Sequence, residues 1–600
     1  MYQSSKRKIF IGHANTLHDP SITIIEGNKI YAEAIERHMQ CKRAIESERL
    51  WYSWRSIKTA LSHLEIMPVK DAEIIWGSPW NVNKYIEHKP GFDPVKFFQP
   101  KHPRSGYELL LSLLMLEQLT VNQVKNTINN LPPHFFPPSP KLNSRNITFL
   151  DPIQFDHHLM HAANAVYTSP FEECLCLIVD GFGESTSIDV FHFHDNQFDS
   201  VMPTETKYKQ GFSKLSLGFL YGLITEYCGF NMWEGEEWKV MGLAAYGKFN
   251  PDIYQYFNDN ITINVFKIDS SLSPDSLRDY LESIGAGIRK FGDSDVLKAA
   301  DLANSFQKWF EDTLIKLVQT ASQTGLSKNL AYGGGCALNS SANGKILAHS
   351  SFENLHIPSA PADDGNSLGV ALYQKHFLNK EKREIKTGSP YLGSWMDTAK
   401  LEKILEFKKI PFEKINDDKK LCSIVAELIA SKNIIGWVQG RAEFGPRALG
   451  NRSIIADPRP QDMKDRINKR IKFREDYRPL APSILHEFGP EYFENYQESP
   501  YMERTLVFKK EVRKKVPAVV HEDGTGRLQT VKEEWNPLYY QLIRTFYQKT
   551  GIPLLLNTSL NVMGKPIVHT VEDALTVFYT TGMDYLIIGH YLIGYLNRSL

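Results

Sequence analysis

CLCLIVDGFGESTSIDVFHF, residues 174–193, consists of an apolar run, a glycine-containing turn and a second β-rich run. The run that ends at Val179 has the length and composition of a buried strand. Asp180 follows it directly and places a carboxylate beside flexible glycine backbone. Because ligand sites in α/β proteins lie at the carboxyl ends of strands, this unit predicts an α/β core with a functional site at Asp180.

The N-terminal segment follows a similar plan. KIFIG (8–12) precedes HDPSITIIEGNKIYAEAI (18–35), in which the turn signal Glu26-Gly27-Asn28 separates two β-rich runs. Two such hairpin-led units, with glycine-rich turns and helices, predict a duplicated α/β nucleotide-binding core. The sequence further predicts strand–glycine loop–helix segments at 330–347 and 355–374. Apolar periodicity predicts helices at 105–128 and 301–324.

The C-terminal third begins after a charged, then Gly/Ser/Pro-containing linker at 380–392. A helix over 421–432 and a strand at 434–440 lead into the loop GRAEFGPRALGNRS, residues 440–453. Three arginines lie among glycines and one proline in this loop. Guanidinium groups pair with phosphate or carboxylate oxygens, so the loop predicts an anion site. A solvated basic loop is the alternative. The arginines are Arg441, Arg447 and Arg452.

Composition sets broad limits. A chain of 600 residues is long enough for two to four domains. Sixty-nine basic residues balance 69 acidic ones, which argues against a general nucleic-acid coat. Six cysteines in this length do not indicate a disulfide framework. Since the apolar N-terminal run is short and no apolar run reaches about 18 residues, we expect a cytoplasmic protein without membrane or nucleic-acid partners.

A set of histidines and aspartates has the composition of a metal site. His157 and His161 are four residues apart, so on a helix both imidazoles lie on one face. With Asp180 and the pair Asp363-Asp364, they would suit Fe(II), Mn(II) or Zn(II). Taken alone, a histidine pair with this spacing is more often a surface or core feature than a metal site, and the two aspartate positions strengthen the metal interpretation.

Other candidate groups lie in loops. Gly333, Gly334 and Gly335, with Asn339, precede a predicted helix and favour a nucleotide phosphate. His18 follows the first strand and is a candidate general base. Lys42 could neutralise a phosphate. The segment WEGEEWKVMGLAAYG (233–247) carries acidic groups and a lysine whose role chemistry alone does not assign.

The C-terminal part supplies further donors from several segments. Arginines from separate loops, with hydroxyl and amide groups after an apolar strand, predict a phosphate pocket. A nucleic-acid groove is less well supported, because interleaved aromatics and excess positive charge are not prominent. These donors are Lys472, Arg474, Arg478, Arg527, Asn557, Thr558 and Ser559.

Nine motifs, taken in order, resemble those of the O-carbamoyltransferase family that includes nodulation and antibiotic carbamoyltransferases. They are HDPS, HHLMHAA, VDGFGE, WKVMGLAAYG, GGGCALN, DDGNSLG, GRAEFGPRALGNRS, KFREDYRPLAPS and NTSLN. The resemblance covers nearly the whole chain. It implies a Kae1-like domain of the actin/Hsp70/sugar-kinase fold over 1–386 and a YrdC-like α/β domain over 387–600.

The resemblance also implies a two-step reaction. The C-terminal domain would join carbamoyl phosphate and ATP, with Mg²⁺, into carbamoyl adenylate. The N-terminal domain would then pass the carbamoyl group to a hydroxyl, near His18 as base and Lys42. The implied metal is iron, held by the His/Asp set, with Asp364 preferred over Asp363 because it precedes Gly365. The implied C-terminal site residues are Arg447, Arg452, Lys472, Arg478, Arg527 and Ser559.

The acceptor is not encoded in any motif. Aromatic residues over 50–105 favour an acceptor-binding region, and a helical insertion is the alternative. We expect a small natural-product alcohol of antibiotic or saxitoxin type, and a homodimer is compatible with the resemblance. Two other functions stay open: a tRNA threonylcarbamoylation-type enzyme, and a non-catalytic ATP-binding actin-like module.

Overall fold

The structure is a computed structural model that describes residues 6–14, 18–44, 72–80, 148–150, 153–184, 186–202 and 216–594. The helix expected over 105–128 and most of the 50–105 segment lie outside these ranges. Its helices are α1 (Ile35–Met39), α6 (His157–Tyr167), α8 (Leu217–Tyr227), α9 (Glu237–Ala244), α10 (Pro251–Asn260), α11 (Pro274–Ser283), α12 (Ala300–Ser322), α13 (Ser340–Asn343), α14 (Asn366–Tyr373), α15 (Thr398–Phe407), α16 (Asp418–Ala430), α17 (Met463–Ile467), α18 (Gly489–Tyr492), α19 (Lys510–Arg513), α20 (Pro537–Thr550) and α21 (Val571–Thr580).

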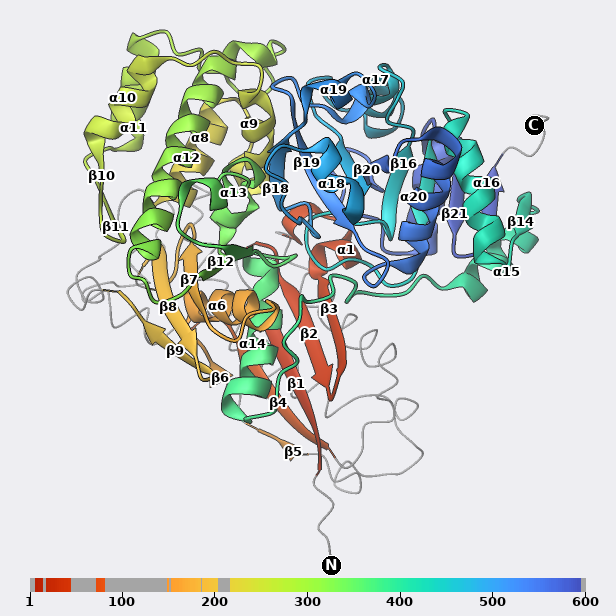
Figure 1. The fold of residues 1–600 in the computed structure, drawn as a ribbon, viewed down its shortest axis with the longest axis horizontal. Helices are drawn as coiled ribbons and strands as arrows, with labels where there is room; N and C mark the ends of the chain where they lie inside the picture. The colour runs from red at the N-terminus through yellow and green to blue at the C-terminus, as the bar shows by residue number, and fades with distance from the viewer. Residues whose placement is uncertain are drawn as a thin grey trace, which may run out of the picture.

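Two sheets of the N-terminal part share one plan (Figure 1). The first runs β3 (Lys29–Ala34), β2 (Ser21–Glu26), β1 (Arg7–Ala14), β4 (Ala72–Ser78), β5 (Thr148–Phe149), with β6 (Ile153–Gln154) also on β4. The second runs β9 (Gln197–Ser200), β8 (Ile188–His194), β7 (Cys174–Val179), β12 (Asn329–Gly333), β13 (Asn354–His356). In each sheet an antiparallel meander of three strands is extended by parallel strands. This repeated order is the duplicated α/β unit that the sequence predicts.

Both predicted hairpin-led units are present. Glu26 pairs with Lys29 across a two-residue turn, where Gly27 has a φ of +55° that favours glycine. Strand β7 pairs antiparallel with β8 along its whole length, which leaves Asp180 just beyond its carboxyl end. The strand–turn–strand interpretation of 174–193 is therefore confirmed.

Helices α6 and α14 pack against each other between the two sheets, with α14 on β1 and β2 and α6 on β7 and β12 (Figure 1). Glycine permits this close approach, since a Cβ on Gly369 would lie 2.0 Å from the carbonyl oxygen of Met160. Helix α6 starts at His157, and α14 starts just after the short 3₁₀ turn Asp363–Gly365. The packing therefore brings groups from both helix starts to one place.

A layer of helices from α8 to α12 covers the other face of the second sheet. The predicted 301–324 helix is α12, which buries an apolar face against strand and helix residues of this layer. In the part of the chain that the structure describes, each helix is too short or too polar to span a bilayer. The buried face of α12 includes Leu302, Phe306, Trp309, Phe310, Leu314 and Leu317.

The C-terminal part forms one mixed sheet, in the order β14 (Phe412–Lys414), β22 (Tyr591–Gly594), β21 (Tyr585–Ile588), β15 (Ile435–Val438), β16 (Arg452–Ala456), β20 (Leu554–Ser559), β17 (Ala481–Leu485), β19 (Thr525–Val531), β18 (Arg504–Val507). Helices α16 and α20 pack together over its apolar core. Helix α16 is the helix expected at 421–432, and β15 is the strand expected before the arginine loop. The YrdC-like assignment and the boundary at 386/387 stay predictions.

The two parts interlock through side chains. Tyr477, from the C-terminal part, is buried in the core of the helical layer, and Phe444 is buried in the core between the N-terminal sheets. Arg441 donates to the carbonyl oxygens of Gly393 and Ile30, at 3.0 and 2.7 Å. The C-terminal part is thus seated on the N-terminal part (Figure 1), and residues from both can form one site.

Candidate metal centre and basic cavity

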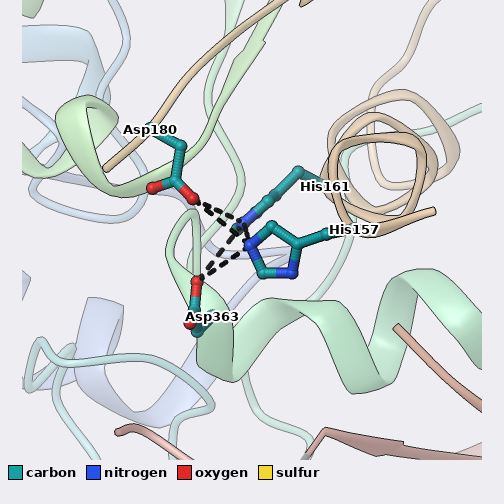
Figure 2. Close-up of side chains that lie close together, drawn as sticks. All are labelled: His157, His161, Asp180 and Asp363. Carbon is teal, nitrogen blue, oxygen red and sulfur yellow. Dashed lines mark hydrogen bonds and ion pairs between the residues drawn. The ribbon is translucent and has the colours of Figure 1, made fainter. Parts of the chain in front are cut away.

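Two histidines and two aspartates converge where α6, β7 and the start of α14 meet (Figure 2). The Nε2 atoms of His157 and His161 lie 3.2 Å apart. Asp180 Oδ2 lies 3.2 and 3.6 Å from these nitrogens, and Asp363 Oδ1 lies 3.5 and 3.4 Å from them. All four side chains are buried. The structure therefore brings together ligand atoms that are far apart in the sequence.

These separations fit a metal ion. Four ligand atoms at bonds of about 2.1 Å in a tetrahedron lie about 3.4 Å from one another, close to the separations of 3.2 to 3.6 Å between these side-chain atoms. The backbone N–H of Gly335 donates to Asp180 Oδ1 at 2.7 Å, which leaves Oδ2 for the centre. Although burial disfavours its charged form, the carboxylates of Asp363 and Asp180 raise the pKa of His157 well above its usual value. A divalent cation bound among these side chains would take the place of the proton on His157 in balancing the charge of the two carboxylates.

The preference for Asp364 is wrong in position and is corrected to Asp363. In the tight 3₁₀ turn that contains both residues, consecutive side chains point in different directions, so only one can face the histidines. The backbone carbonyl of Asp364 accepts a hydrogen bond from the Ser21 hydroxyl at 2.5 Å. Burial, with nearby acidic groups, raises the pKa of the Asp364 carboxyl well above its usual value.

Two residues beside the centre had not been singled out from the sequence. The indole of Trp80 stacks on the His157 ring with centroids 4.2 Å apart. The amide of Asn366 lies 3.3 Å from His157 Nδ1 and 3.1 Å from His161 Nε2. Asn366 directly follows the Asp363-Asp364-Gly365 motif. This position in the sequence is what could have indicated that Asn366 lies beside the His/Asp group.

The predicted base, His18, lies at the edge of this centre. Its Nδ1 is 3.0 Å from Asp19 Oδ2 and 3.9 Å from Asp363 Oδ2, and its side chain is one-third exposed. Arg43 forms an ion pair with Asp19 at 3.0 Å. Although burial opposes ionisation, Arg43 and His18 lower the pKa of Asp19 to about 2. A chain of ionisable residues, Asp363, His18, Asp19 and Arg43, therefore extends from the centre toward solvent.

The triple-glycine segment lies beside the His/Asp group, where Gly335 donates its backbone N–H to Asp180. Gly334 has a φ of +90°, and a Cβ there would lie 2.3 Å from the Val179 carbonyl oxygen, so only glycine fits. Asn339 caps α13 and exchanges hydrogen bonds with Gln307. Gly333, Gly334, Gly335 and Asn339 do not line the basic cavity described next. Their assignment to a nucleotide stays a prediction.

A second site is a cavity between the C-terminal sheet and the N-terminal part. Predicted residues from five separate segments line it, together with residues of α9 that the sequence had left without a role. The predicted residues that line it are Lys42, Arg447, Lys472, Arg474, Arg478, Arg527, Asn557, Thr558 and Ser559. The added ones include Glu236, Trp238, Lys239, Ser340 and Ser341.

Two arginines in this cavity lack protein partners. Arg447 has no hydrogen bond or carboxylate partner among the described residues, and burial lowers its pKa to about 10. The Nε atom of Arg527 is buried and has no hydrogen-bond partner among the residues that the structure describes. Burial lowers the pKa of Arg527 well below its usual value, and repulsion from Arg447, Arg474 and Arg478 adds to this. Half-buried guanidinium groups without protein partners indicate a site for a bound anion.

Lysine and hydroxyl groups complete the wall. Lys472 ends a π-helical turn, and its ammonium donates to Ser559 Oγ at 3.2 Å and to Asn561 Oδ1 at 2.7 Å. Burial lowers the pKa of Lys472 well below its usual value, and Arg474, Arg478 and Lys42 lower it further. Lys42, from the N-terminal part, is therefore close enough to repel the C-terminal cations.

Arg452 does not face this cavity, and the expectation for it is corrected. Its side chain is fully buried, and its guanidinium donates to backbone carbonyl oxygens. The acceptors are Gln439 (2.7 Å), Asn451 (2.8 Å), Ser394 (2.9 Å) and Gly440 (3.3 Å). These hydrogen bonds connect the two ends of the arginine loop with each other and with Ser394, so Arg452 holds the loop in shape.

Comparison with known proteins identifies the family. Residues 10–372 match the family described as "Carbamoyltransferase N-terminus", and residues 426–594 match "Carbamoyltransferase C-terminus". This chain belongs to the carbamoyltransferase family. The resemblance drawn from the nine motifs is therefore confirmed, and the protein is a carbamoyltransferase enzyme.

Curated relatives match over most of this carbamoyltransferase. It is 37% identical over 505 residues to nodulation protein NolNO of Sinorhizobium fredii, covering 80% of this chain and 69% of that protein. It is 34% identical to nodulation protein NolO of Bradyrhizobium diazoefficiens, covering 74% and 80%. A crystal structure of T. kodakarensis HypF shares 13% identity at a TM-score of 0.31, over 63% of this chain and 48% of that one.

Proposed function

We propose that this carbamoyltransferase is ATP-dependent and acts in two steps at its two sites. In the basic cavity, carbamoyl phosphate and ATP give carbamoyl adenylate. Beside the metal-ligand group, the carbamoyl group passes to a hydroxyl of a small natural-product alcohol and AMP is released. ATP and carbamoyl phosphate are the co-substrates of this reaction, and Mg²⁺ is its cofactor.

The observation that carries the proposal is the buried cationic cluster. Arg447 and Arg527 have no carboxylate partner among the described residues, and Lys472 and Arg478 lie around the same space. ATP and carbamoyl phosphate together are strongly anionic, and their mutual repulsion must be offset before they react. Fixed cations that lack internal partners supply that offset without first breaking an ion pair.

The reaction balances with one water molecule. Water cleaves carbamoyl phosphate to carbamate and inorganic phosphate. A carbamate oxygen attacks the α-phosphorus of ATP, the bond to the β-phosphate oxygen breaks, and pyrophosphate leaves. Arg447 and Arg527 are placed to stabilise charge on the phosphates, and Mg²⁺ would be held mainly by ATP. The acceptor alcohol then attacks the carbamoyl carbon, and AMP leaves.

The N-terminal site is suited to the transfer step. His157, His161, Asp180 and Asp363 would hold a divalent ion, with iron as the proposed metal, and such an ion would supply a Lewis acid for substrate oxygens. His18 is one-third exposed and lies between this group and solvent. We assign it the proton of the acceptor hydroxyl, which it can take while Asp19 accepts a hydrogen bond from its Nδ1.

The proposal is tested by pyrophosphate release from ATP and Mg²⁺, with and without carbamoyl phosphate. We expect release only when both substrates are present, and at least about a 100-fold loss in Arg447→Ala. Arg544→Ala is the matched control, since Arg544 is exposed on α20 and does not line the cavity. Release that is independent of carbamoyl phosphate, or an Arg447→Ala enzyme as active as Arg544→Ala, would contradict the proposal.

A further inference from the structure

Helix α9 and the turn before it, residues 234–244, form a wall of the basic cavity from the N-terminal side. This is the segment whose acidic groups and lysine the sequence left without a role. Opposite it lies the C-terminal loop 474–479, which carries two of the cavity's arginines. Gly242 of α9 lies against this loop, since a Cβ there would be in ordinary van der Waals contact with Pro479 and Tyr477, at 3.6 and 3.7 Å.

One contact joins the two walls directly. The guanidinium carbon of Arg478 lies 3.4 Å from the centre of the Trp238 ring, which is the separation of a stacked cation–π pair. Arg478 Nη1 donates to Glu475 Oε2 at 3.3 Å. Its other two nitrogens have no hydrogen-bond partner among the described residues. Arg478 is therefore held by one face and one nitrogen, and the remaining donors stay available to a ligand.

Neighbouring contacts hold this arrangement in place. Lys239, next to Trp238, forms an ion pair with Glu236 and lies 3.6 Å from Glu475 Oε1. Glu475 thus connects Lys239 of one part with Arg478 of the other. Tyr477, between them in the loop, is buried in the N-terminal helical core, where its ring lies 6.1 Å edge-on from that of Tyr246. The loop is thus anchored by Glu475 and Tyr477, directly before Arg478.

We infer that Trp238 is a positioning residue that fixes the Arg478 guanidinium in the basic cavity, so that the anion site of the C-terminal sheet is completed by the N-terminal helix α9. This inference rests on the proposed function, since it assigns Arg478 to the phosphates of ATP or carbamoyl phosphate. The planar indole sets the plane of the guanidinium, which a lysine at 478 could not adopt. The anion site is therefore shared between the two parts of the chain.

The test uses the full-length protein and inorganic pyrophosphate as probe, with binding measured by titration calorimetry. A lost cation–π contact in a buried site weakens binding by about 10-fold. We expect that increase in Kd in Trp238→Leu, a smaller one in Trp238→Phe, and none in Trp233→Leu. Trp233 is the matched control, since it precedes the same helix, is 43% exposed and does not line the cavity.

A merely structural role would change stability and not the ligand-specific readouts. We expect KM for ATP to rise in Trp238→Leu with kcat changed less, and partial recovery in Trp238→Phe. The double variant Trp238→Leu/Arg478→Lys should bind pyrophosphate no more weakly than Arg478→Lys alone. Wild-type protein that binds pyrophosphate, with a Trp238→Leu variant that binds it equally, would overturn the inference and leave the proposed function standing. Wild-type protein that binds no pyrophosphate would overturn the proposed anion site itself.

Discussion

Lys42 and Arg43 are adjacent in the chain and face the two different sites. Lys42 lines the basic cavity, whereas Arg43 pairs with Asp19 at 3.0 Å beside the metal-ligand group. The backbone separates the two side chains because Arg43 has a φ of +57°, in the left-handed region. One short turn of the N-terminal part therefore connects the site proposed for adenylate formation with the site proposed for transfer.

The two neighbours should give different phenotypes. Lys42→Met should raise KM for ATP or carbamoyl phosphate several-fold, because it removes a cation from the cavity wall. Arg43→Met should instead lower stability by about 1–3 kcal/mol, because it leaves Asp19 without its arginine partner and removes one of the two donors to the Met232 carbonyl oxygen. Steady-state kinetics and denaturant unfolding of both variants separate the effects. Equal effects of both variants on KM would contradict the assignment of Lys42 and Arg43 to different sites.

The arginine loop offers a second matched pair. Arg447→Ala should abolish pyrophosphate release while leaving the melting temperature unchanged or higher, since a half-buried unpaired charge is removed. Arg452→Ala should lower stability by about 3 kcal/mol or more, because it removes several hydrogen bonds at once and leaves the buried Gln439 carbonyl oxygen without its donor. Calorimetric melting and pyrophosphate assays on both proteins test this. The account fails if Arg447→Ala is the less stable of the two.

Metal content distinguishes the two adjacent aspartates. Asp363→Asn and His161→Ala should each reduce the bound divalent metal of purified protein by about 10-fold or more, because each removes a ligand atom of the buried group. Asp364→Asn should retain the metal, since its carboxyl lies outside that group. Elemental analysis of the three variants and the wild type gives the answer. Metal lost from Asp364→Asn but kept in Asp363→Asn would reverse the assignment.

The interface also carries a buried acid–histidine group. Glu33 accepts hydrogen bonds from His38 (2.9 Å) and from Ser394 (2.9 Å), and His569 lies 3.3 Å away. Burial lowers the pKa of His38 below its usual 6.5. Between the lowered pKa of His38 in the folded protein and its usual pKa in the unfolded chain, the unfolded chain binds a proton that the folded chain does not. The free energy of unfolding therefore decreases as the pH falls below about 6.5.

Glu33 does not account for that window. Burial opposes its ionisation, yet His569 and His38 hold its pKa well below 4.5, so its contribution is lost only in stronger acid. Unfolding measured at about pH 7.5 and about pH 5.5 should therefore show a decrease in stability that is smaller in His38→Gln. His194→Gln is a control on an exposed histidine. An unchanged pH dependence in His38→Gln would argue against this origin.

Several features were predictable from local sequence because short-range chemistry decides them. The apolar run before Asp180 and the turn at Gly27 determine the two hairpin-led units. The spacing of His157 and His161 on one helix face brings both imidazoles to one side. The family motifs then placed most C-terminal donors correctly in one cavity.

Other features depend on tertiary contacts that spacing does not reveal. Composition cannot tell which arginine of the loop faces a ligand. Glu443, buried in the same loop, accepts hydrogen bonds from the backbone N–H groups of Leu449, Asn451 and Arg452 at 2.7 to 3.1 Å. That contact sets the loop's shape. The role of Trp238 was hidden for the same reason, since its partner is 240 positions away in the chain.

Isotope exchange between labelled pyrophosphate and ATP, without any acceptor alcohol, decides whether the basic cavity forms an adenylate. Exchange reports reversible adenylate formation, because pyrophosphate can re-enter ATP only by attacking an enzyme-bound adenylate. We predict exchange that requires both carbamoyl phosphate and Mg²⁺ and that disappears in Arg447→Ala but not in Arg544→Ala. Exchange that proceeds equally without carbamoyl phosphate, or that persists in Arg447→Ala, would contradict the claim that the basic cavity makes carbamoyl adenylate.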